Sequence, residues 1–229
     1  MDGQSEQYRT LLLPNIEYDP QKMNRKWCNI NESGILVNKP SEVKHTDLTS
    51  GLQCFKGVTG RMYVPTSGCA FWETDVDCMV RESAELNDVI AEVGICVDEH
   101  CDDTTGIFNN EHAWSVMVIS CETHNSICLC AYSRIEELCC IPVTDFKINS
   151  RLKITLGLLV DIDNATLHII HVDDNTVVHS IPNIDVSRPL MPMFGVHCPG
   201  HFDVKVRVPS DTDLSVNREL LVLLSSLVK

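Results

Sequence analysis

Long apolar runs are missing from this sequence of 229 residues. No stretch approaches the roughly 20 apolar residues that a membrane-spanning helix requires. The first residues, 1–10, are polar and acidic, unlike the apolar core of an export signal. These absences argue against insertion into a membrane and give no sign of secretion. We therefore expect a soluble protein located in the cytoplasm.

Positive charge is also scarce. The chain has 18 lysines and arginines against 32 aspartates and glutamates, which gives a formal net charge of −14. A surface with this excess of negative charge repels the phosphates of nucleic acids and anionic lipids. Nucleic acids and membrane surfaces are therefore not expected among the partners.

Helical periodicity is almost absent, and no linker rich in proline, glycine and serine divides the chain. Short segments instead alternate large apolar residues with polar ones and end in turn-forming residues, which is typical of antiparallel strands with one buried face. About ten to thirteen such strands predict an all-β fold, a two-sheet antiparallel β-sandwich in one domain. The clearest segments are 70–76, 89–97, 113–120, 126–132, 152–160, 166–172, 176–181, 190–196 and 202–208.

The amino-terminal part gives weaker signals. Residues 1–14 are expected to form a polar leader, and the sandwich is expected to span residues 15–208. Asp19-Pro20 predicts a turn, because proline fixes its own φ and disfavours a helical conformation of the residue before it. The other expected elements here are strands at 26–30, 35–37 and 61–64, with a turn between Gly57 and Gly60.

Residues 209–229 form an apolar tail with a different pattern. Ser215, with Arg218 and Glu219 nearby, is a candidate start for a helix over the leucine-rich end of the chain. A short packed helix is the first expectation. The alternative is that Leu220–Val228 stay exposed and contact a partner.

Paired C-x2-C knuckles, the usual mark of structural zinc, are lacking despite twelve cysteines and nine histidines. Cys128 and Cys130 would share one face of a strand, which suits packing as well as metal binding. The other candidate ligands are Cys139, Cys140, His197, Cys198 and His201. We expect reduced cysteines that pack as small apolar residues, with no metal and no cofactor.

Signs of catalysis are few. No local sequence resembles the turn that presents a nucleophile, and the paired acids Asp161 and Asp163 fall in an expected hairpin turn. Trp114 belongs to a residue type that stacks on sugars, but it lies inside an expected strand and is assigned to the core. We expect no enzyme. A carbohydrate-binding (lectin-like) sandwich or another all-β enzyme domain remains the alternative to a protein-binding domain.

Several motifs in a fixed order resemble those of SPRY domains. Phe71–Val76 is similar to the aromatic-tryptophan-glutamate strand of that family, and Val93–Cys96 is similar to its valine-glycine-valine strand. The other matching segments are Ala113–Val116, Leu158–Asn164 and Pro189–Phe194. Further upstream, the segments Asp19-Pro20, Arg25-Lys26 and Ser33-Gly34 resemble the PRY extension that precedes SPRY in tripartite-motif (TRIM) proteins.

The resemblance implies a fold, a function and a context. It implies two stacked antiparallel sheets, a variable protein-binding surface formed by loops at one end, and no catalysis by this domain. TRIM ligases carry catalysis on a zinc-bearing RING, whose cysteine and histidine spacing is absent here, so the resemblance implies the substrate-recognition part of such a ubiquitin ligase. Asp19-Pro20, Arg25-Lys26 and Gly57–Arg61 are most similar to the midline subgroup, in which SPRY follows a fibronectin type III module.

The loop 98–112 is the main candidate for recognition of a protein or peptide. Phe108 stands among polar residues there, so it is either exposed for binding or packed into the core. By the resemblance, this loop and the segments 122–126, 132–137 and 197–201 lie at or near one binding end. The acidic loop predicts a partner with a basic surface. The candidate binding residues are Glu99, His100, Asp102, Asp103, Phe108, Asn109, Asn110, Tyr132, Arg134, His197 and His201.

Overall fold

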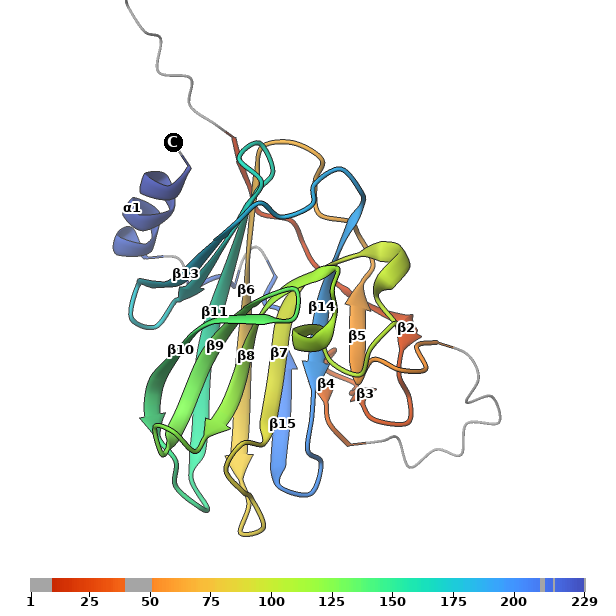
Figure 1. Ribbon diagram of the computed structural model, residues 1–229, viewed down its shortest axis with the longest axis vertical. Coiled ribbons are helices and arrows are strands. Elements are labelled where there is room, and N and C mark those ends of the chain that lie inside the picture. Colours follow the sequence, from red (N-terminus) through yellow and green to blue (C-terminus); the bar gives the residue numbers. More distant parts are fainter. Residues whose placement is uncertain (1–9, 40–50, 211–212, 216, 229) are drawn as a thin grey trace, which may run out of the picture.

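Two stacked β-sheets form the body of the protein in the computed structural model, which describes residues 10–39, 51–210, 213–215 and 217–228 (Figure 1). The predicted antiparallel sandwich with a short carboxy-terminal helix is therefore confirmed. That helix is α1 (Arg218–Leu227). No helix among the described residues is long and apolar enough to cross a membrane.

The first sheet has eight strands. Its path runs through β13 (Thr176–Pro182), β12 (Thr166–His171), β11 (Arg151–Asp161), β6 (Cys69–Val80), β15 (Phe202–Arg207), β4 (Leu36–Val37) and β3 (Asn29–Ile30). The eighth strand, β1 (Leu11–Leu12), pairs in parallel with the start of β6. The sandwich therefore begins before residue 15, where the sequence placed the end of a polar leader. Residues 1–9 of that leader lie outside the described residues.

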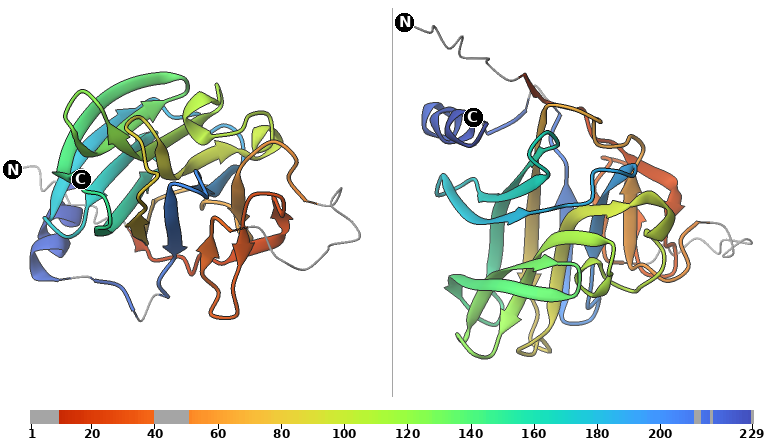
Figure 2. Two further views of the ribbon diagram at one scale, coloured as in Figure 1. Left: turned by 90° about the horizontal axis from the view of Figure 1, so that it is seen from below. Right: turned by 45° about the horizontal axis from the view of Figure 1, so that its top comes forward.

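The second sheet has seven strands. Its path runs through β10 (Glu136–Asp145), β9 (Ser126–Ser133), β8 (Ala113–Cys121), β7 (Val89–Val97), β14 (Leu190–Val196), β5 (Gly57–Gly60) and β2 (Tyr18–Met23). All its neighbours are antiparallel. The two sheets lie face to face, as the two views of Figure 2 show.

The main core lies between the sheets and follows from the alternation in the sequence. In β15, Phe202, Val204 and Val206 are buried, whereas Lys205 and Arg207 point to solvent, as the period of two in a strand requires. Trp114 is only 1% exposed, so its assignment to the core is confirmed.

Both outer faces carry a second, smaller core. Over β7 and β14, residues of the segments 51–56 and 98–112 form an apolar cluster that includes Phe55 and Ile107. This cover explains why β14 is buried along its whole length rather than on alternate residues. Over β6, β11 and β12, Leu220 and Leu224 of α1 form the corresponding cluster on the other sheet.

The tail is thus a packed helix, as the first expectation had it, but its start differs. Asn217, rather than Ser215, is the residue that caps the helix, because its side-chain oxygen accepts the backbone N–H of Leu220 at 2.8 Å. The backbone N–H of Ser215 instead donates to the buried carboxylate of Glu73 in β6 at 2.7 Å. Burial raises the pKa of Glu73, and the hydrogen bond from Ser215 opposes that rise.

Several predictions for individual elements were wrong. Asp19-Pro20 lies within β2 rather than in a turn, because proline is tolerated in an edge strand whose ladder is irregular. Gly57–Gly60 forms the strand β5, where the sequence predicted a turn. Of the expected strand 26–30, only Asn29–Ile30 pairs. The strand β10 was not predicted; it contains Pro142, which an edge strand tolerates.

Most of the cysteines are buried in the structure. All twelve are free thiols. Burial raises the pKa of the Cys28 and Cys78 thiols to about 12 in each case. These two residues therefore act as small apolar side chains in the main core, with no tendency to ionise at neutral pH.

Candidate partner-binding surface

The segment 98–112 connects the end of β7 to the start of β8 and folds over the outer face of the seven-stranded sheet (Figure 1). Its base is closed by backbone hydrogen bonds from Val97 to His112 and from Asp98 to Pro189, each 3.0 Å long. Two short 3₁₀ turns, Asp98–His100 and Ile107–Asn109, give it a fixed shape. The loop is therefore a structured layer.

Three of the residues predicted to bind a partner instead hold this layer in shape. The carboxylate of Asp102 accepts backbone N–H groups of the neighbouring segment, including that of Phe55 at 2.9 Å. The side chain of Asn109 accepts the N–H of Gly106 at 3.2 Å. Asn110 is buried, and its amide donates to the carbonyl of His100 at 2.8 Å. Their polar groups have intramolecular partners, so the structure gives them a role in shaping the loop.

A buried carboxylate fastens the loop to the sheet. Glu92 in β7 is fully buried, and it accepts the backbone N–H of Ile107 at 2.7 Å. The backbone N–H of Phe108 approaches its other oxygen at 3.4 Å. The Nε2 of His197 lies 3.3 Å from the same carboxylate. Since a carboxylate is costly to bury without partners, these contacts explain how Glu92 is tolerated here.

His197 and His201 are corrections to the predicted site. His197 is buried beside Glu92, so its ring is not available to a partner. His201 is partly exposed but lies at the other end of the sheet, where its Nδ1 is 2.5 Å from the carboxylate of Asp88. The antiparallel strands explain this separation, because β14 carries the chain away from the loop end before residue 197 is reached.

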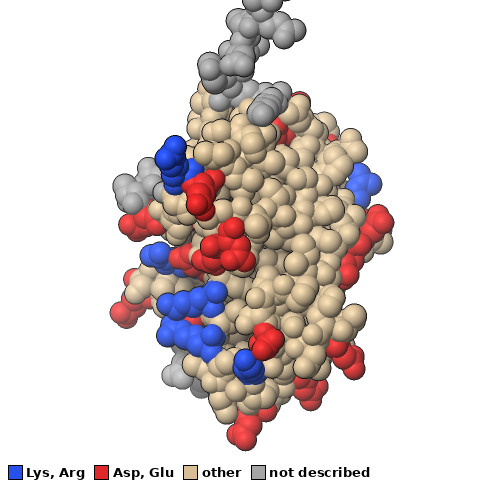
Figure 3. All heavy atoms as spheres, turned by 90° about the vertical axis from the view of Figure 1, so that its left-hand side faces the viewer, with Lys and Arg blue, Asp and Glu red and all other residues tan. Residues whose placement is uncertain are grey.

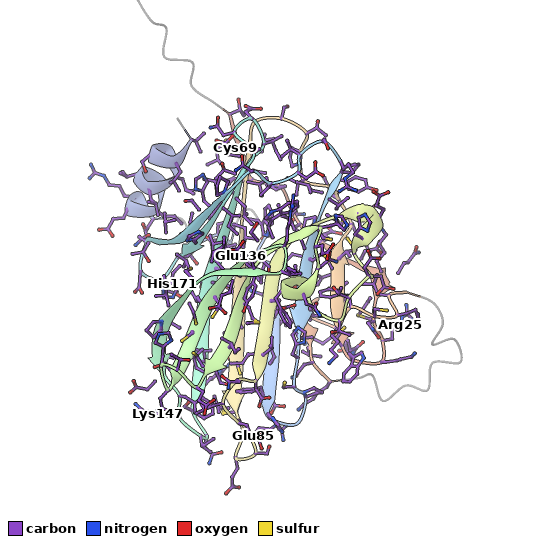
Figure 4. All side chains as sticks on the ribbon, viewed as in Figure 1. Arg25, Cys69, Glu85, Glu136, Lys147 and His171 are labelled. Carbon is purple, nitrogen blue, oxygen red and sulfur yellow. The ribbon has the colours of Figure 1, made fainter. Side chains whose placement is uncertain are left out.

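The turn at 122–126 shares that other end. It connects β8 to β9 at the ends opposite to the loop 98–112, and Asn87 donates to the carboxylate of Glu122 there at 2.9 Å. Figure 4 labels Glu85 and Lys147 in two further turns at the same end, with Glu136 nearer the loop 98–112. The expectation that all four segments share one binding end is therefore wrong.

A charged cluster remains exposed at the loop end. Arg188, just before β14, donates to Glu99 at 2.8 Å and to Asp185 at 3.1 Å. The rings of His100 and His112 stack at a centroid distance of 3.7 Å. The Nδ1 of His100 is 2.7 Å from the carboxylate of Asp103. Of the predicted residues, Glu99, His100 and Asp103 are thus brought together, and Arg188 and His112 are additions that the sequence reasoning missed.

A shallow pocket of about 420 Å³ lies beside this cluster and includes the tip of the β9–β10 hairpin. Arg134 turns the hairpin with a positive φ of 60°, and its N–H donates to the carbonyl of Ala113 at 2.7 Å. The next residue, Ile135, is 61% exposed. The pocket is lined by Glu111, His112, Arg134, Ile135 and Arg188. We call these five residues, with Glu99, His100 and Asp103, the loop-end surface.

Phe108 and Tyr132 lie next to this surface but are partly covered. Their rings make an edge-to-face contact at 5.8 Å on the outer face of the sheet. The hydroxyl of Tyr132 donates to Glu137 at 2.7 Å. Burial and the contact with Glu137 raise the pKa of Tyr132. The sequence left open whether Phe108 is exposed for binding or packed into the core. In the structure it is partly covered on the outer face and lies outside the main core.

Comparison with solved structures identifies the class of fold. The TRIM65 PSpry domain superimposes with a TM-score of 0.61 at 14% sequence identity, over 87% of this chain and 94% of that one. The SPRY domain of human HERC1 gives a TM-score of 0.52 at 13% identity, over 86% and 99% of the two chains. The chain therefore has the SPRY fold, as the sequence motifs predicted.

A third similar structure comes from a different kind of protein. Stonustoxin matches with a TM-score of 0.55 and 16% identity, over 86% of this chain but only 27% of the toxin chain. No protein-family model and no curated protein matches the sequence. At these identities the comparisons establish the fold, and the midline subgroup stays a prediction.

Proposed function

We propose that this chain is a protein-interaction module that binds a protein or peptide segment on the loop-end surface. The observation that carries the proposal is Ile135, an exposed branched apolar residue at a hairpin tip, next to a pocket between Arg134 and Arg188. Arginine is enriched at the energetic centres of protein interfaces, and an aliphatic side chain can serve as the anchor that an interface buries. The SPRY fold supports the same class of function.

Charge supports a partner with a basic segment. Glu99, Asp103, Glu111 and Asp185 place four carboxylates at this end, against the two arginines Arg134 and Arg188, and Arg188 is paired with Glu99 and Asp185. The chain as a whole carries a formal net charge of −14. A basic peptide would be drawn to this surface by electrostatic steering, and its association rate would fall as salt is added.

The likeness to the TRIM65 PSpry domain supports a finer proposal about context. In this proposal the chain is the substrate-recognition part of a TRIM-type ubiquitin ligase in the cytoplasm. A carbohydrate-binding role has less support, because Trp114, the candidate for stacking on a sugar, is buried in the core.

Helix α1 offers a second, smaller contact for a partner. Leu221 and Val222 lie on its exposed side, while Leu220 and Leu224 are buried against the sheet. One side of the helix is packed against the sheet, and the other side exposes apolar residues that a partner can contact. A Val222→Asp variant separates this contact from the loop-end surface, because it leaves the buried leucines in place.

A peptide-display selection on the purified chain tests the main proposal. Peptides rich in lysine and arginine should be enriched, and Ile135→Asp should weaken their binding about tenfold or more. Ile148→Asp is the control, because Ile148 is also an exposed isoleucine and lies in the connection from β10 to β11, at the other end of the sandwich. Equal binding by both variants would contradict the proposed surface, and binding lost only in Val222→Asp would move the site to α1.

A further inference from the structure

A cluster of sulfur and nitrogen ligands lies at the far end of the seven-stranded sheet, away from the loop-end surface. Cys121 is the last residue of β8, His124 lies in the turn to β9, Cys128 lies in β9, and Cys140 lies in the edge strand β10. One ligand atom from each of the four residues falls within 4.8 Å of every other. The loop-end surface does not involve any of these residues.

The strand register explains why these side chains meet. Cys128 pairs with Ile119 of β8 and with Pro142 of β10, so Cys121 and Cys140 are each two residues along from its direct partners. Such diagonal neighbours on one face of a sheet are within reach of each other's side chains. The cysteines belong to the outer-face cluster with Met117, separate from the main core. The tight turn at 122–125 then places the ring of His124 beside them.

The distances resemble the edges of a tetrahedral metal site. Zinc bonds of about 2.3 Å to sulfur and 2.05 Å to nitrogen imply sulfur–nitrogen edges of about 3.6 Å and sulfur–sulfur edges of about 3.8 Å. The Sγ atoms of Cys121 and Cys128 both lie 3.4 Å from the Nδ1 of His124. The remaining separations, up to 4.8 Å, exceed the ideal edge by about 1 Å or less. Small side-chain rotations close that difference.

Hydrogen bonding alone does not account for two sulfurs around one ring nitrogen. A neutral imidazole nitrogen has either one proton to donate or one lone pair to accept with, so Nδ1 makes one good hydrogen bond. Here two thiols approach it at the same distance. A cation at the centre accepts lone pairs from all four ligand atoms at once.

We propose that Cys121, His124, Cys128 and Cys140 form a Cys3His site for a structural zinc ion. The spacing is C-x2-H-x3-C followed by a distant cysteine, so the local pair is C-x2-H rather than the C-x2-C whose absence led the sequence reasoning to expect no metal. On binding, the three thiols release their protons to solvent, and the zinc is held by three thiolates and the neutral imidazole. The soft donor set selects zinc over magnesium or calcium.

The site would fasten the sheet at a weak point. The strand β10 is an edge strand, contains Pro142 and has two irregularities in its pairing with β9. Zinc would join it to the β8–β9 hairpin through side chains. Of the other ligand candidates considered from the sequence, Cys130 lies in the same outer-face cluster, opposite Cys140, but outside the group of four. Cys139 and Cys198 point elsewhere: Cys139 approaches the carbonyl of Val178, and Cys198 approaches Asp88.

Metal analysis of the purified, tag-free full chain tests this proposal. After dialysis against a weak chelator, we expect about one zinc ion per wild-type chain. Cys140→Ser should reduce the zinc content at least tenfold. Cys139→Ser, the control at the adjacent position, should retain it. Less than a tenth of an equivalent in fully reduced wild-type protein would overturn the proposal, as would an equal loss in both variants.

Cobalt substitution guards against variants that simply fail to fold. Co²⁺ added to the reduced wild-type chain should give the visible bands of tetrahedral cobalt together with a sulfur-to-cobalt charge-transfer band. His124→Cys keeps four ligands and should retain these bands, whereas His124→Ala should lose the tetrahedral spectrum. Absence of the bands in the wild type would contradict the proposal. So would a disulfide within the cluster, detected as fewer than twelve free thiols when the natively prepared chain is unfolded in chelator and titrated.

Discussion

The exposed part of the eight-stranded sheet and the covered part of the seven-stranded sheet are built on different principles. On the eight-stranded sheet, Arg207 pairs with Asp75 and Arg151 with Asp77 across neighbouring strands, at partly exposed positions. Figure 3 shows lysines and arginines gathered with acidic residues along one side of its view. On the seven-stranded sheet, a buried carboxylate, Glu92, fixes a loop layer over the strands.

The first region relies on ion pairs that water can reach, whereas the second relies on buried hydrogen bonds. Ion pairs at exposed positions are screened by water and salt, so each adds little and each is replaceable. Buried polar groups depend on specific partners, and the loss of one partner leaves the other unsatisfied. We therefore expect stability to depend on few residues where a segment covers a sheet, as over Glu92, and to be spread over many residues at the exposed ion pairs.

The largest expected effect is that of Glu92→Ala. The substitution removes the acceptor for the N–H groups of Ile107 and Phe108 and leaves His197 buried without its carboxylate. Each buried donor left without an acceptor costs about 1–3 kcal/mol, so we expect a loss of about 3–5 kcal/mol of unfolding free energy. Urea unfolding measures that loss, and hydrogen exchange should show faster exchange at the amides of Ile107 and Phe108.

Glu92→Gln is the matched control, because it keeps the shape and one acceptor oxygen. It should lose clearly less stability than Glu92→Ala. If both variants unfold at the wild-type urea concentration, Glu92 does not fasten the loop, and the contrast between the two faces fails.

The strands of the sandwich were predictable where the sequence alternates or stays continuously apolar. Val89–Val97 and Leu190–Val196 are strands with the predicted bounds. The errors arose at proline, which is found both in turns and in edge strands. Asp19-Pro20 was predicted as a turn and the segment around Pro142 was not predicted as a strand. Both prolines lie in edge strands, whose outer side needs no backbone donor.

The candidate surface was less predictable, because it depends on which strand ends meet. Residue type alone selected Glu99, His100 and Asp103 correctly as neighbours, since they lie in one short segment. Arg188 is distant in sequence and reaches them only through the start of β14. The resemblance placed all four segments at one end of the sheet, and alternation could not correct this, because it gives the face of a residue but not the direction of its strand.

The next largest effect is expected where α1 covers the eight-stranded sheet. Leu224→Ala removes a buried side chain from the cluster with Phe71 and Leu159 and should cost about 2–3 kcal/mol. Val222→Ala on the exposed side of the same helix is the control and should change stability little. Thermal unfolding followed by circular dichroism measures both. A wild-type melting temperature for Leu224→Ala would show that α1 does not depend on this contact for docking.

A smaller effect is expected for the charged face. Arg207→Ala removes the partner of Asp75, whose oxygen lies 3.0 Å from the guanidinium, and should cost less than about 1 kcal/mol. Adding salt to the wild type should remove most of that difference, because the pair is accessible to ions. A loss as large as that of Glu92→Ala would mean that the two faces do not differ as proposed. The measurement is urea unfolding of both proteins at low and high salt.

The smallest effect concerns acid. The hydrogen bond from Arg151 lowers the pKa of Asp77 below its ordinary value of 3.8. As the pH falls, the unfolded chain therefore protonates at Asp77 before the folded chain does. The contribution of Asp77 to the unfolding free energy is fully present above the ordinary pKa, and it is lost as the pH drops through the lowered pKa of the folded state. Asp77→Asn should flatten the dependence of unfolding free energy on pH below about pH 4. Asp145→Asn, at an aspartate whose side chain is 75% exposed, is the control and should leave the slope as it is. Equal slopes in the wild type and Asp77→Asn would show that water screens the pair fully, and the charged face would then contribute to solubility rather than to stability.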